Sequence, residues 1–331
     1  MSARAEVVVV TGASAGVGRA VAHAFAKRGA QVGLLARDRR KLDATQREVE
    51  SLGGRAIAIP TDVADFAQVE AAAEAVEAQL GPIDVWVNDA MATIFARFVE
   101  IEPEEFKRAT EVTYLGAVHG TMAALRRMVP RNRGVVVQVG SALAYRAIPL
   151  QSAYCGAKFA MRGFTDSVRT ELLHDGSDVW ITMVQLPALN TPQFGWCRTK
   201  LPNHPQPVPP IYQPEVAADA VYWAAHQRRR EIDVGLSSVK AIVGNKIAPR
   251  FADWYLARTG FKSQQIEDMP VERPAGNLFD PVPEGSTHGI FDAQARTRSY
   301  QLWATTHRPL LAAAAAGLAG AVAGVTRVVR G

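Results

Sequence analysis

The sequence predicts an α/β fold: three layers, with a doubly wound parallel sheet between two layers of helices. Short runs rich in β-branched residues are apolar throughout instead of alternating, which is typical of strands covered on both faces. Longer Ala-rich stretches with helical patterning separate successive runs, as in βαβ units. The predicted strands are 7–10, 31–36, 56–60, 84–88, 134–140 and 179–186.

Composition and breaks in the pattern predict the domain organisation. The chain has 331 residues, 48% apolar and 21% charged, which suits one large domain with an appendage. The main domain is expected over 1–235, with a proline-rich lid at 187–213 that cannot be a long helix. A helix is predicted over 214–230. Residues 236–308 form an extension whose pattern indicates no fold, and 309–331 form an apolar tail.

Several classes of protein fit the composition poorly. The apolar run before Thr11 has four residues, too short for a signal-peptide core of about 7–15. Two cysteines and seven histidines show no disulfide framework or metal-ligand spacing. The net charge of +5 is spread along the chain without a nucleic-acid-binding motif. We therefore expect a cytoplasmic protein with no metal and no nucleic-acid partner.

A glycine-rich turn follows the first predicted strand. In "TGASAGVGRA", Gly12, Gly16 and Gly18 allow the backbone to turn tightly and to approach a pyrophosphate. The anion would lie on the amino end of the next helix, predicted over 17–28, where N–H groups and the helix dipole favour negative charge. This strand–turn–helix context predicts dinucleotide binding.

The end of the second strand indicates which dinucleotide. An acidic residue there would bind a free 2′-hydroxyl, but Ala36 and Arg37 stand there instead, and a guanidinium suits a 2′-phosphate. NADP(H) is therefore favoured over NAD(H), although the adjacent Asp38 argues the other way. Asp62 and Val63 follow the third strand and are placed to meet the adenine, and 88–91 are placed to line the cofactor cleft.

Tyr154 and Lys158 are four residues apart in a helix expected from about Ala153, so both side chains share one face. A protonated Lys near a phenol favours the phenolate and lowers the pKa of the Tyr, as a general acid or base requires. Taken alone, such a pair is also explained by a Tyr packing along a Lys stem.

Over about residues 5–235, the chain resembles the short-chain dehydrogenase/reductase family. The resemblance rests on the glycine pattern, "TDV" at 61–63, "VNDAM" at 87–91, Ser141, the Tyr154–Lys158 pair and "LPALNTP" at 186–192. It implies a Rossmann fold, reversible hydride transfer between NADP(H) and a small-molecule carbonyl or secondary alcohol, and a homo-oligomer.

The resemblance also implies roles for single residues. Tyr154 would donate or accept the proton, Lys158 would acidify it and hold the nicotinamide ribose, and Ser141 would bind the substrate oxygen. Thr191 and the backbone near 186–189 would hold the carboxamide. The expected cofactor contacts are Gly12, Ser14, Gly16, Val17, Gly18, Arg37, Asp62, Val63, Asn88, Ala90, Tyr154, Lys158, Pro187 and Thr191.

Three positions depart from the family pattern. Asp89 and Met91 replace a usual Asn and Gly after the fourth strand, so the wall of the cleft is expected to differ. Thr113 stands where many members have an Asn that tethers a proton relay to the active Lys. We interpret Thr113 as a variant of that relay.

The substrate is less well indicated than the chemistry. Phe194, Trp196, Ile211 and Tyr212 in the lid suit a bulky apolar ketone or alcohol, but they would equally pack the lid onto the domain. An alternative function is that of a catalytically silent NADP-binding regulatory or scaffold protein.

The tail is open to three interpretations. Residues 310–326 are apolar or small and are flanked by Arg308, Arg327 and Arg330. They would form a short tail anchor, a helix lying on a membrane or partner, or a soluble helix packed on the domain. Peripheral or tail-anchored attachment at the inner face of a membrane is thus one hypothesis for this segment.

Overall fold

The computed structural model describes residues 4–272, 275–283 and 285–313. Within these residues, seven strands form one parallel sheet in the order β10-β7-β6-β4-β1-β2-β3. The order reverses direction beside β1, so the sheet is doubly wound and the predicted fold class is confirmed. The strands are β1 Val7–Thr11, β2 Gln31–Ala36, β3 Arg55–Pro60, β4 Val85–Asn88, β6 Val135–Ser141, β7 Trp180–Leu186 and β10 Glu231–Asp233.

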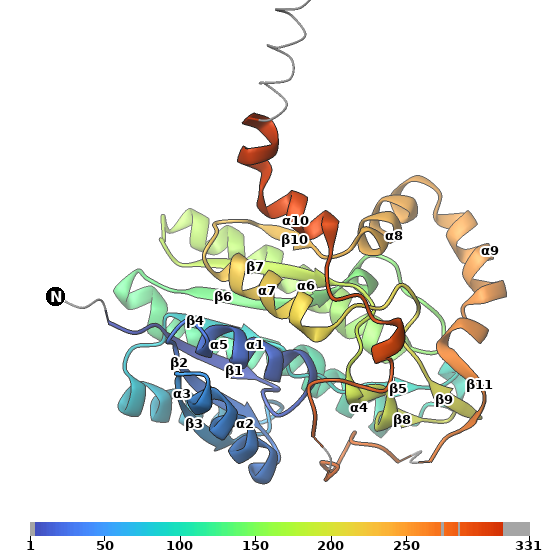
Figure 1. Cartoon of the computed structure of the whole chain (residues 1–331), viewed down its shortest axis with the longest axis horizontal. Coiled ribbons are helices and arrows are strands. Elements are labelled where there is room, and N and C mark those ends of the chain that lie inside the picture. The colour runs from blue at the N-terminus through green and yellow to red at the C-terminus, as the bar shows by residue number, and fades with distance from the viewer. Residues whose placement is uncertain (1–3, 273–274, 284, 314–331) are drawn as a thin grey trace, which may run out of the picture.

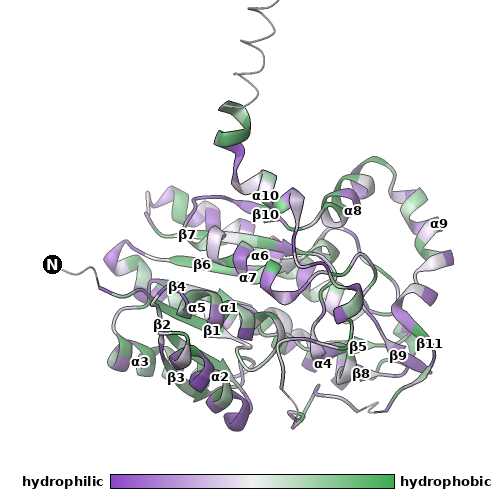
Figure 2. Ribbon diagram, in the orientation of Figure 1, coloured by the Kyte–Doolittle hydropathy of each residue, from purple (hydrophilic) through white to green (hydrophobic). Residues whose placement is uncertain are grey.

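Helices cover both faces of the sheet (Figure 1), which explains the continuously apolar strands. In β1, Val8 and Val10 join an apolar cluster with α1 and α7, whereas Val7 and Val9 join a second cluster with α3 and α5. Alternate side chains of one strand thus enter opposite layers. Figure 2 shows the inner strands as hydrophobic and α2 as largely hydrophilic. The helices of this part are α1 Gly16–Ala26, α2 Arg39–Ser51, α3 Phe66–Leu80, α4 Pro103–Thr110, α5 Gly116–Met128, α6 Ser152–His174 and α7 Pro214–Ala225.

One helix is shorter than predicted, and one strand was not predicted. The helix expected over 214–230 ends at Ala225, and β10 begins after five intervening residues. Ile232, between Glu231 and Asp233, is the apolar residue of β10, so the segment lacks a recognisable apolar run. Pairing with β7 from Met183 to Gln185 makes it a strand.

The lid is an ordered segment that packs onto the domain. It contains β8 (Arg198–Thr199), which pairs with β5 (Ile94–Phe95), and β9 (Asn203–Pro205). Phe194 and Ile211 join a buried cluster with Phe95. The lid's predicted aromatic residues are therefore largely buried as packing residues, and Phe194 also reaches a cavity described below.

The extension adds helices and one strand beside the lid. Strand β11 (Gln265–Pro270) pairs antiparallel with β9. Helices α8 (Leu236–Ile247) and α9 (Pro249–Thr259) form a hairpin at the end of the molecule opposite the N-terminus (Figure 1), and α10 is Tyr300–Thr306. The short turns of 3₁₀ or π helix are Phe98–Glu100, Glu111–Leu115, Val129–Arg131, Ala142–Ala144, Pro192–Gly195, Lys262–Gln264 and Asp292–Gln294.

The predicted tail lies mostly outside the described residues. Residues 308–313 are helical, and 314–331 are not described. Within 4–272, 275–283 and 285–313, no helix combines the length and apolarity needed to cross a membrane. The same residues contain no group of three or more His, Cys, Asp or Glu side chains that could hold a metal ion.

Candidate active site

The glycine-rich turn connects the carboxyl end of β1 to the amino end of α1. Gly12 has φ +73°, and a Cβ there would lie 3.0 Å from the Cα of Ala90. At Gly18, a Cβ would lie 2.4 Å from the carbonyl oxygen of Gly12. Side chains at these positions would therefore collide with backbone, so this conformation of the turn before the helix N-terminus requires glycine at both.

A cavity of about 190 Å³ lies over this turn. The predicted cofactor residues that line it are Gly12, Ser14, Gly16, Val17, Arg37, Asp62, Val63, Ala90 and Thr191. The structure thus brings together the ends of β1, β2 and β3, the loop after β4 and the start of the lid.

Asn88 is the main exception among the predicted cofactor contacts. Its side chain is buried, accepts a hydrogen bond from the Trp86 indole at 2.8 Å, and donates to the Thr121 hydroxyl and the Gln138 amide oxygen. These bonds connect β4, α5 and β6 below the cavity. Neither Asn88 nor Gly18 is among the described residues that line the cavity. Both residues instead support the backbone around it.

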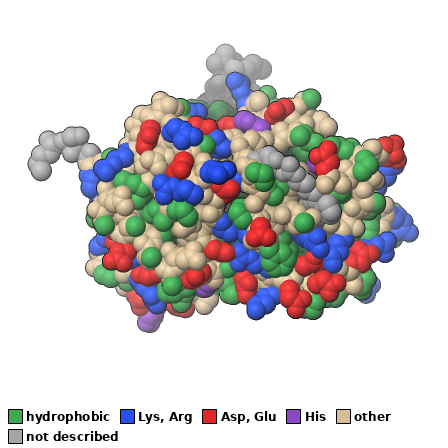
Figure 3. Space-filling model, turned by 90° about the horizontal axis from the view of Figure 1, so that it is seen from below, with side chains coloured by type: hydrophobic (Ala, Val, Ile, Leu, Met, Phe, Trp, Pro, Cys, Tyr) green, Lys and Arg blue, Asp and Glu red, His purple; other side chains and the backbone are tan. Residues whose placement is uncertain are grey.

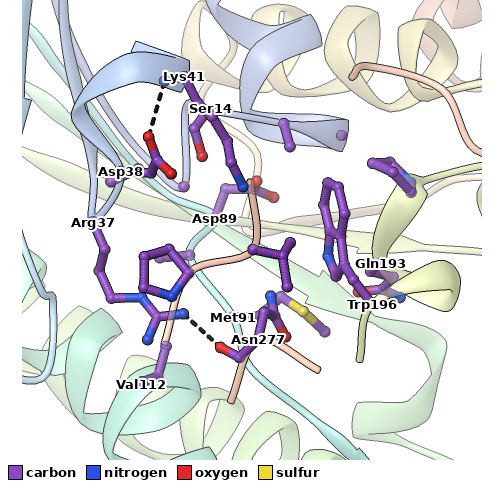
Figure 4. A pocket seen from close by; sticks show the side chains of 18 of the residues that line it. Ser14, Arg37, Asp38, Lys41, Asp89, Met91, Val112, Gln193, Trp196 and Asn277 are labelled. Atoms are coloured by element: carbon purple, nitrogen blue, oxygen red, sulfur yellow. Dashed lines mark hydrogen bonds between the residues drawn. The ribbon is translucent and has the colours of Figure 1, made fainter. Parts of the chain in front are cut away.

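Two cationic side chains from β2 and α2 reach the cavity. Figure 4 shows Arg37 and Lys41 directed into it, with Trp196 and Gln193 across from them. The Lys41 ammonium lies 5.0 Å from the centroid of the Trp196 ring. Asp38 accepts a hydrogen bond from the Lys41 N–H at 3.1 Å and caps α2, so its carboxylate is already engaged. Lys41 was not predicted, because its direction depends on this capped turn.

A segment of the extension covers the cavity. We call it the roof segment and define it as residues 277–283 and 285–289, of which Asn277, Pro281 and Val282 line the cavity. The Arg37 guanidinium donates hydrogen bonds of 2.6 Å to the carbonyl oxygens of Asn277 and Phe279. Burial and the neighbouring Arg108 lower the pKa of Arg37. Arg37 therefore holds the roof as well as facing the cavity.

The roof segment also contacts the glycine-rich turn. The Gly16 N–H donates to the carbonyl oxygen of Ser286 at 2.9 Å, and the Arg19 guanidinium donates to that of Gly285 at 3.2 Å. The sequence offered no signal for these contacts, since about 270 residues separate the partners.

A second cavity, of about 370 Å³, adjoins the first. Both are lined by Val17, Asp89, Met91, Thr191 and Gln193. The second cavity contains Ser141 from the end of β6, Tyr154 and Lys158 from one face of α6, and Pro187 from the lid. Its remaining lining is mostly apolar and comes from 139–151, the lid, α8, α9 and 260–264.

The predicted catalytic side chains meet in the second cavity. The Lys158 ammonium lies 5.6 Å from the centroid of the Tyr154 ring and donates a 2.6 Å hydrogen bond to the carbonyl oxygen of Val139. The Ser141 hydroxyl accepts from the Leu143 N–H at 3.1 Å and is hydrogen-bonded to the Tyr154 phenol. The spacing of the three residues in the sequence therefore corresponds to proximity in space.

The pKa of Tyr154 moves opposite to the direction expected from the sequence. Burial raises it, and the hydrogen bond with Ser141 opposes this only in part. Burial likewise lowers the pKa of Lys158 to about 8, while the carboxylate of Asp89 counteracts that shift. The pKa of Asp89 rises to about 7 because the side chain is buried, although Lys158 and the Gly18 N–H favour its charged form. Desolvation thus outweighs the attraction expected between Lys158 and the phenolate.

Asp89→Asn should shift the pH profile of any reaction that requires a charged Lys158. Removing the carboxylate lowers the pKa of Lys158 below about 8, so the alkaline limb of kcat/KM should move to lower pH by roughly one unit. The measurement is kcat/KM between pH 6 and 10 for both proteins. An unchanged alkaline limb would show that Asp89 does not control this charge.

Thr113 is placed away from both cavities. Its hydroxyl donates to the carbonyl oxygen of Ala92 at 2.7 Å and accepts from the Ala92 N–H at 2.9 Å. These bonds fix the loop after β4, whose residues Asp89, Ala90 and Met91 do line the cofactor cavity. Neither set of described lining residues includes Thr113. The hydroxyl is thus engaged in positioning this loop, and its role in a proton relay stays a prediction.

Comparison with known proteins supports the geometry. A family model described as short chain dehydrogenase matches residues 6–200. This chain belongs to the short-chain dehydrogenase family. It is therefore an oxidoreductase by family, and the predicted resemblance is confirmed.

This short-chain dehydrogenase has relatives along most of its length. It is 31% identical over 317 residues to an uncharacterized oxidoreductase, YxnA, of Bacillus subtilis, covering 95% of this chain and 88% of that protein. It is 35% identical to a 3-dehydrosphinganine reductase of Danio rerio, over 56% of this chain and 57% of the relative. For that second relative, the match spans little more than half of each protein.

Solved short-chain dehydrogenases share its fold. A metagenomic short-chain oxidoreductase in complex with NADP superposes with a TM-score of 0.59 at 27% identity, covering 69% of this chain and 96% of that one. An alcohol dehydrogenase from Thermococcus sibiricus, complexed with 5-hydroxy-NADP, gives a TM-score of 0.61 at 27% identity, with 69% and 95% covered.

The residues present fit a nicotinamide dinucleotide. A Cβ at Gly12 or Gly18 would collide with neighbouring backbone and displace the turn, and the helix N-terminus with two nearby cations matches the charge of phosphate groups. The second cavity, which contains the predicted catalytic residues, is called the catalytic cavity below. Binding of a nicotinamide cofactor follows from this fit together with the NADP complexes of the related structures.

Proposed function

We propose that this chain is an NADP(H)-dependent oxidoreductase that interconverts a bulky, apolar ketone and its secondary alcohol. The observation that carries the proposal is the meeting of Ser141, Tyr154 and Lys158 in an apolar cavity that shares lining residues with the dinucleotide cavity. A silent regulatory protein would have no need for this assembled set.

Each side chain takes a role that its position allows. Tyr154 donates the proton to the carbonyl oxygen during reduction and accepts it back during oxidation. Ser141 binds the same oxygen and keeps it within reach of the phenol. Lys158 supplies positive charge near the phenol and holds the nicotinamide ribose. The bound cofactor supplies or accepts the hydride.

The preference for NADP(H) is supported by the cations beside the adenosine end of the cavity. Arg37 and Lys41 reach into it, and Asp38, which follows Arg37 and also lines the cavity, is occupied in capping α2. A guanidinium and an ammonium attract a 2′-phosphate, whereas a free 2′-hydroxyl needs an acceptor.

The apolar cavity supports a bulky substrate. Its volume of about 370 Å³ lies within the usual range for small-molecule pockets, and its lining includes Leu189, Phe194, Val208 and Leu256. Two relatives that match about half of this chain are named as reductases of 3-dehydrosphinganine and 3-ketodihydrosphingosine, which agrees with a ketone substrate.

A series of methyl ketones of increasing chain length tests this function. With NADPH oxidation followed by absorbance, kcat/KM should rise by about fourfold for each added methylene, because each buried CH₂ contributes about 0.8 kcal/mol. The rise should stop when the cavity is full. Ala241→Phe, which narrows the cavity from α8, should move that limit to shorter ketones without changing NADPH affinity.

Two outcomes would contradict the proposal. A flat dependence on chain length would exclude recognition by apolar burial. NADPH binding without turnover of any ketone, or of any alcohol with NADP⁺, would favour the silent regulatory protein.

A further inference from the structure

The α8–α9 hairpin exposes apolar side chains that the rest of the described residues leave uncovered. None of the eleven residues of α9 is buried. Phe251 is 62% exposed, Trp254 51% and Ile247, at the end of α8, 78%. The Phe251 ring stacks on the ring of Trp254, with centroids 5.7 Å apart, and on the ring of Tyr255, with centroids 6.3 Å apart. Clustered exposed aromatics of this kind mark an interaction surface.

The hairpin is held in place from its inner side. Arg146 donates to the Asn245 amide oxygen at 3.0 Å and forms a 2.6 Å ion pair with Asp253. Asn245 in turn donates to the carbonyl oxygen of Tyr145 at 2.9 Å. These polar contacts fix the hairpin on the domain while its aromatic residues face outward, so the exposed surface is a feature of the folded chain.

The same hairpin is strongly basic. Residues 236–262 contain five cationic side chains and one acidic side chain, Asp253, which Arg146 neutralises. The cationic residues are Lys240, Lys246, Arg250, Arg258 and Lys262. The Arg258 guanidinium lies 4.2 Å from the centroid of the Trp254 ring, so cation and aromatic residue share one surface. On the face drawn in Figure 3, by contrast, acidic and basic side chains are interspersed.

The exposed surface borders the catalytic cavity. Ser237, Ser238 and Ala241 of α8 and Tyr255, Leu256 and Thr259 of α9 line that cavity. The hairpin is therefore a wall of the apolar cavity, and Tyr255 belongs both to that wall and to the exposed aromatic cluster. Figure 2 shows the mixture of hydrophobic and hydrophilic residues along both helices.

We propose that the tip of the α8–α9 hairpin docks on an anionic lipid surface and opens the catalytic cavity toward it. Aromatic residues favour the membrane–water interface, and Lys and Arg are attracted to anionic headgroups. Docking in this way lets an apolar substrate pass from lipid to the cavity. Docking itself goes beyond the proposed function, whereas the delivery of substrate rests on it.

A second copy of the chain is the main competing occupant. In a twofold contact, the same patch faces itself, which would set the cations of one hairpin against those of the other. An anionic lipid surface complements this charge, so the observations favour lipid.

Sedimentation with vesicles of phosphatidylcholine and phosphatidylserine tests the docking surface in the full-length protein. Phe251→Ser/Trp254→Ser should lower the fraction bound at least tenfold, while Leu173→Ser, at a site 71% exposed on α6, should leave it unchanged.

Lys246→Gln/Arg250→Gln should weaken binding by about fivefold for each charge removed. Lys107→Gln/Arg133→Gln, at side chains 75% exposed, is the matched control. Binding should also fall in high salt and on pure phosphatidylcholine.

The outcomes separate docking from catalysis. The altered residues do not line the cavity, so NADPH oxidation with a short, soluble ketone should be unchanged and reduction of a vesicle-embedded ketone should fall. Equal vesicle binding by all variants, or no binding of the unaltered chain at low salt, would overturn the docking proposal. So would a smaller particle in light scattering after Phe251→Ser/Trp254→Ser, because the patch would then join subunits. The charge variants keep the test decisive if the aromatic variant does not fold.

Discussion

Replacing Tyr154 by Phe is expected to lower turnover by about 10²–10⁴-fold, because it removes the hydroxyl that we propose to exchange a proton with the substrate oxygen. The phenol sits in the catalytic cavity, hydrogen-bonded to Ser141 and near Lys158. NADPH affinity should change little, since the glycine-rich turn and Arg37 are untouched. Steady-state turnover and NADPH fluorescence titration measure the two quantities separately.

Tyr145 provides the matched control. Its phenol donates a 2.6 Å hydrogen bond to Glu231 and lies outside the described lining of both cavities. Tyr145→Phe should therefore retain turnover while removing the same atom from the protein. Full activity in Tyr154→Phe would eliminate the assigned mechanism, and equal losses in both variants would indicate a structural effect.

Replacing Arg37 by Asp should weaken NADPH binding by about 100-fold more than NADH binding. Hydrogen bonds to charged groups contribute about 1.5–3 kcal/mol, and the new carboxylate would in addition repel the 2′-phosphate. Calorimetric titration of both cofactors gives the comparison. Lys41→Gln should show a smaller effect in the same direction, since it removes the second cation without adding a negative charge.

NADH also serves as the internal control for the roof segment. Arg37 binds the carbonyl oxygens of Asn277 and Phe279, so Arg37→Asp loosens the roof whichever cofactor is present. That effect should appear equally for NADH and NADPH, and only the difference reports on the 2′-phosphate. Equal total losses for both cofactors would refute the placement of Arg37 beside the phosphate.

The central sheet could be predicted because its signal is local. Runs such as 7–10 and 134–140 are apolar throughout, and the structure covers both faces of these strands. Strand β10 could not be predicted, because Ile232 is its one apolar residue. The segment becomes a strand by pairing with β7. The extension escaped prediction for the same reason: β11 depends on β9, about 60 residues earlier.

In the candidate site, too, features that depend on local sequence could be predicted and those that depend on distant contacts could not. The proximity of Ser141, Tyr154 and Lys158 follows from one strand end and one helix face. The pKa of Tyr154 could not be predicted, because it depends on how deeply neighbouring elements bury the phenol. Asn88 and Thr113 form hydrogen bonds to groups more than 20 residues away in the sequence. A local motif does not indicate such partners, so the structural roles of these two residues could not be predicted.

The two roles of Arg37, in the cavity and in the roof segment, affect how cofactor preference could evolve. In the proposed mode of NADP(H) binding, one side chain both faces the adenosine end of the cofactor and holds the roof segment through backbone carbonyls, which every residue type at 277 and 279 would also present. A mutation in this single codon would alter cofactor choice and roof closure together, and no substitution at 277 or 279 restores the lost bonds. Divergence toward NADH would therefore need compensating changes elsewhere in the roof before selection could retain it.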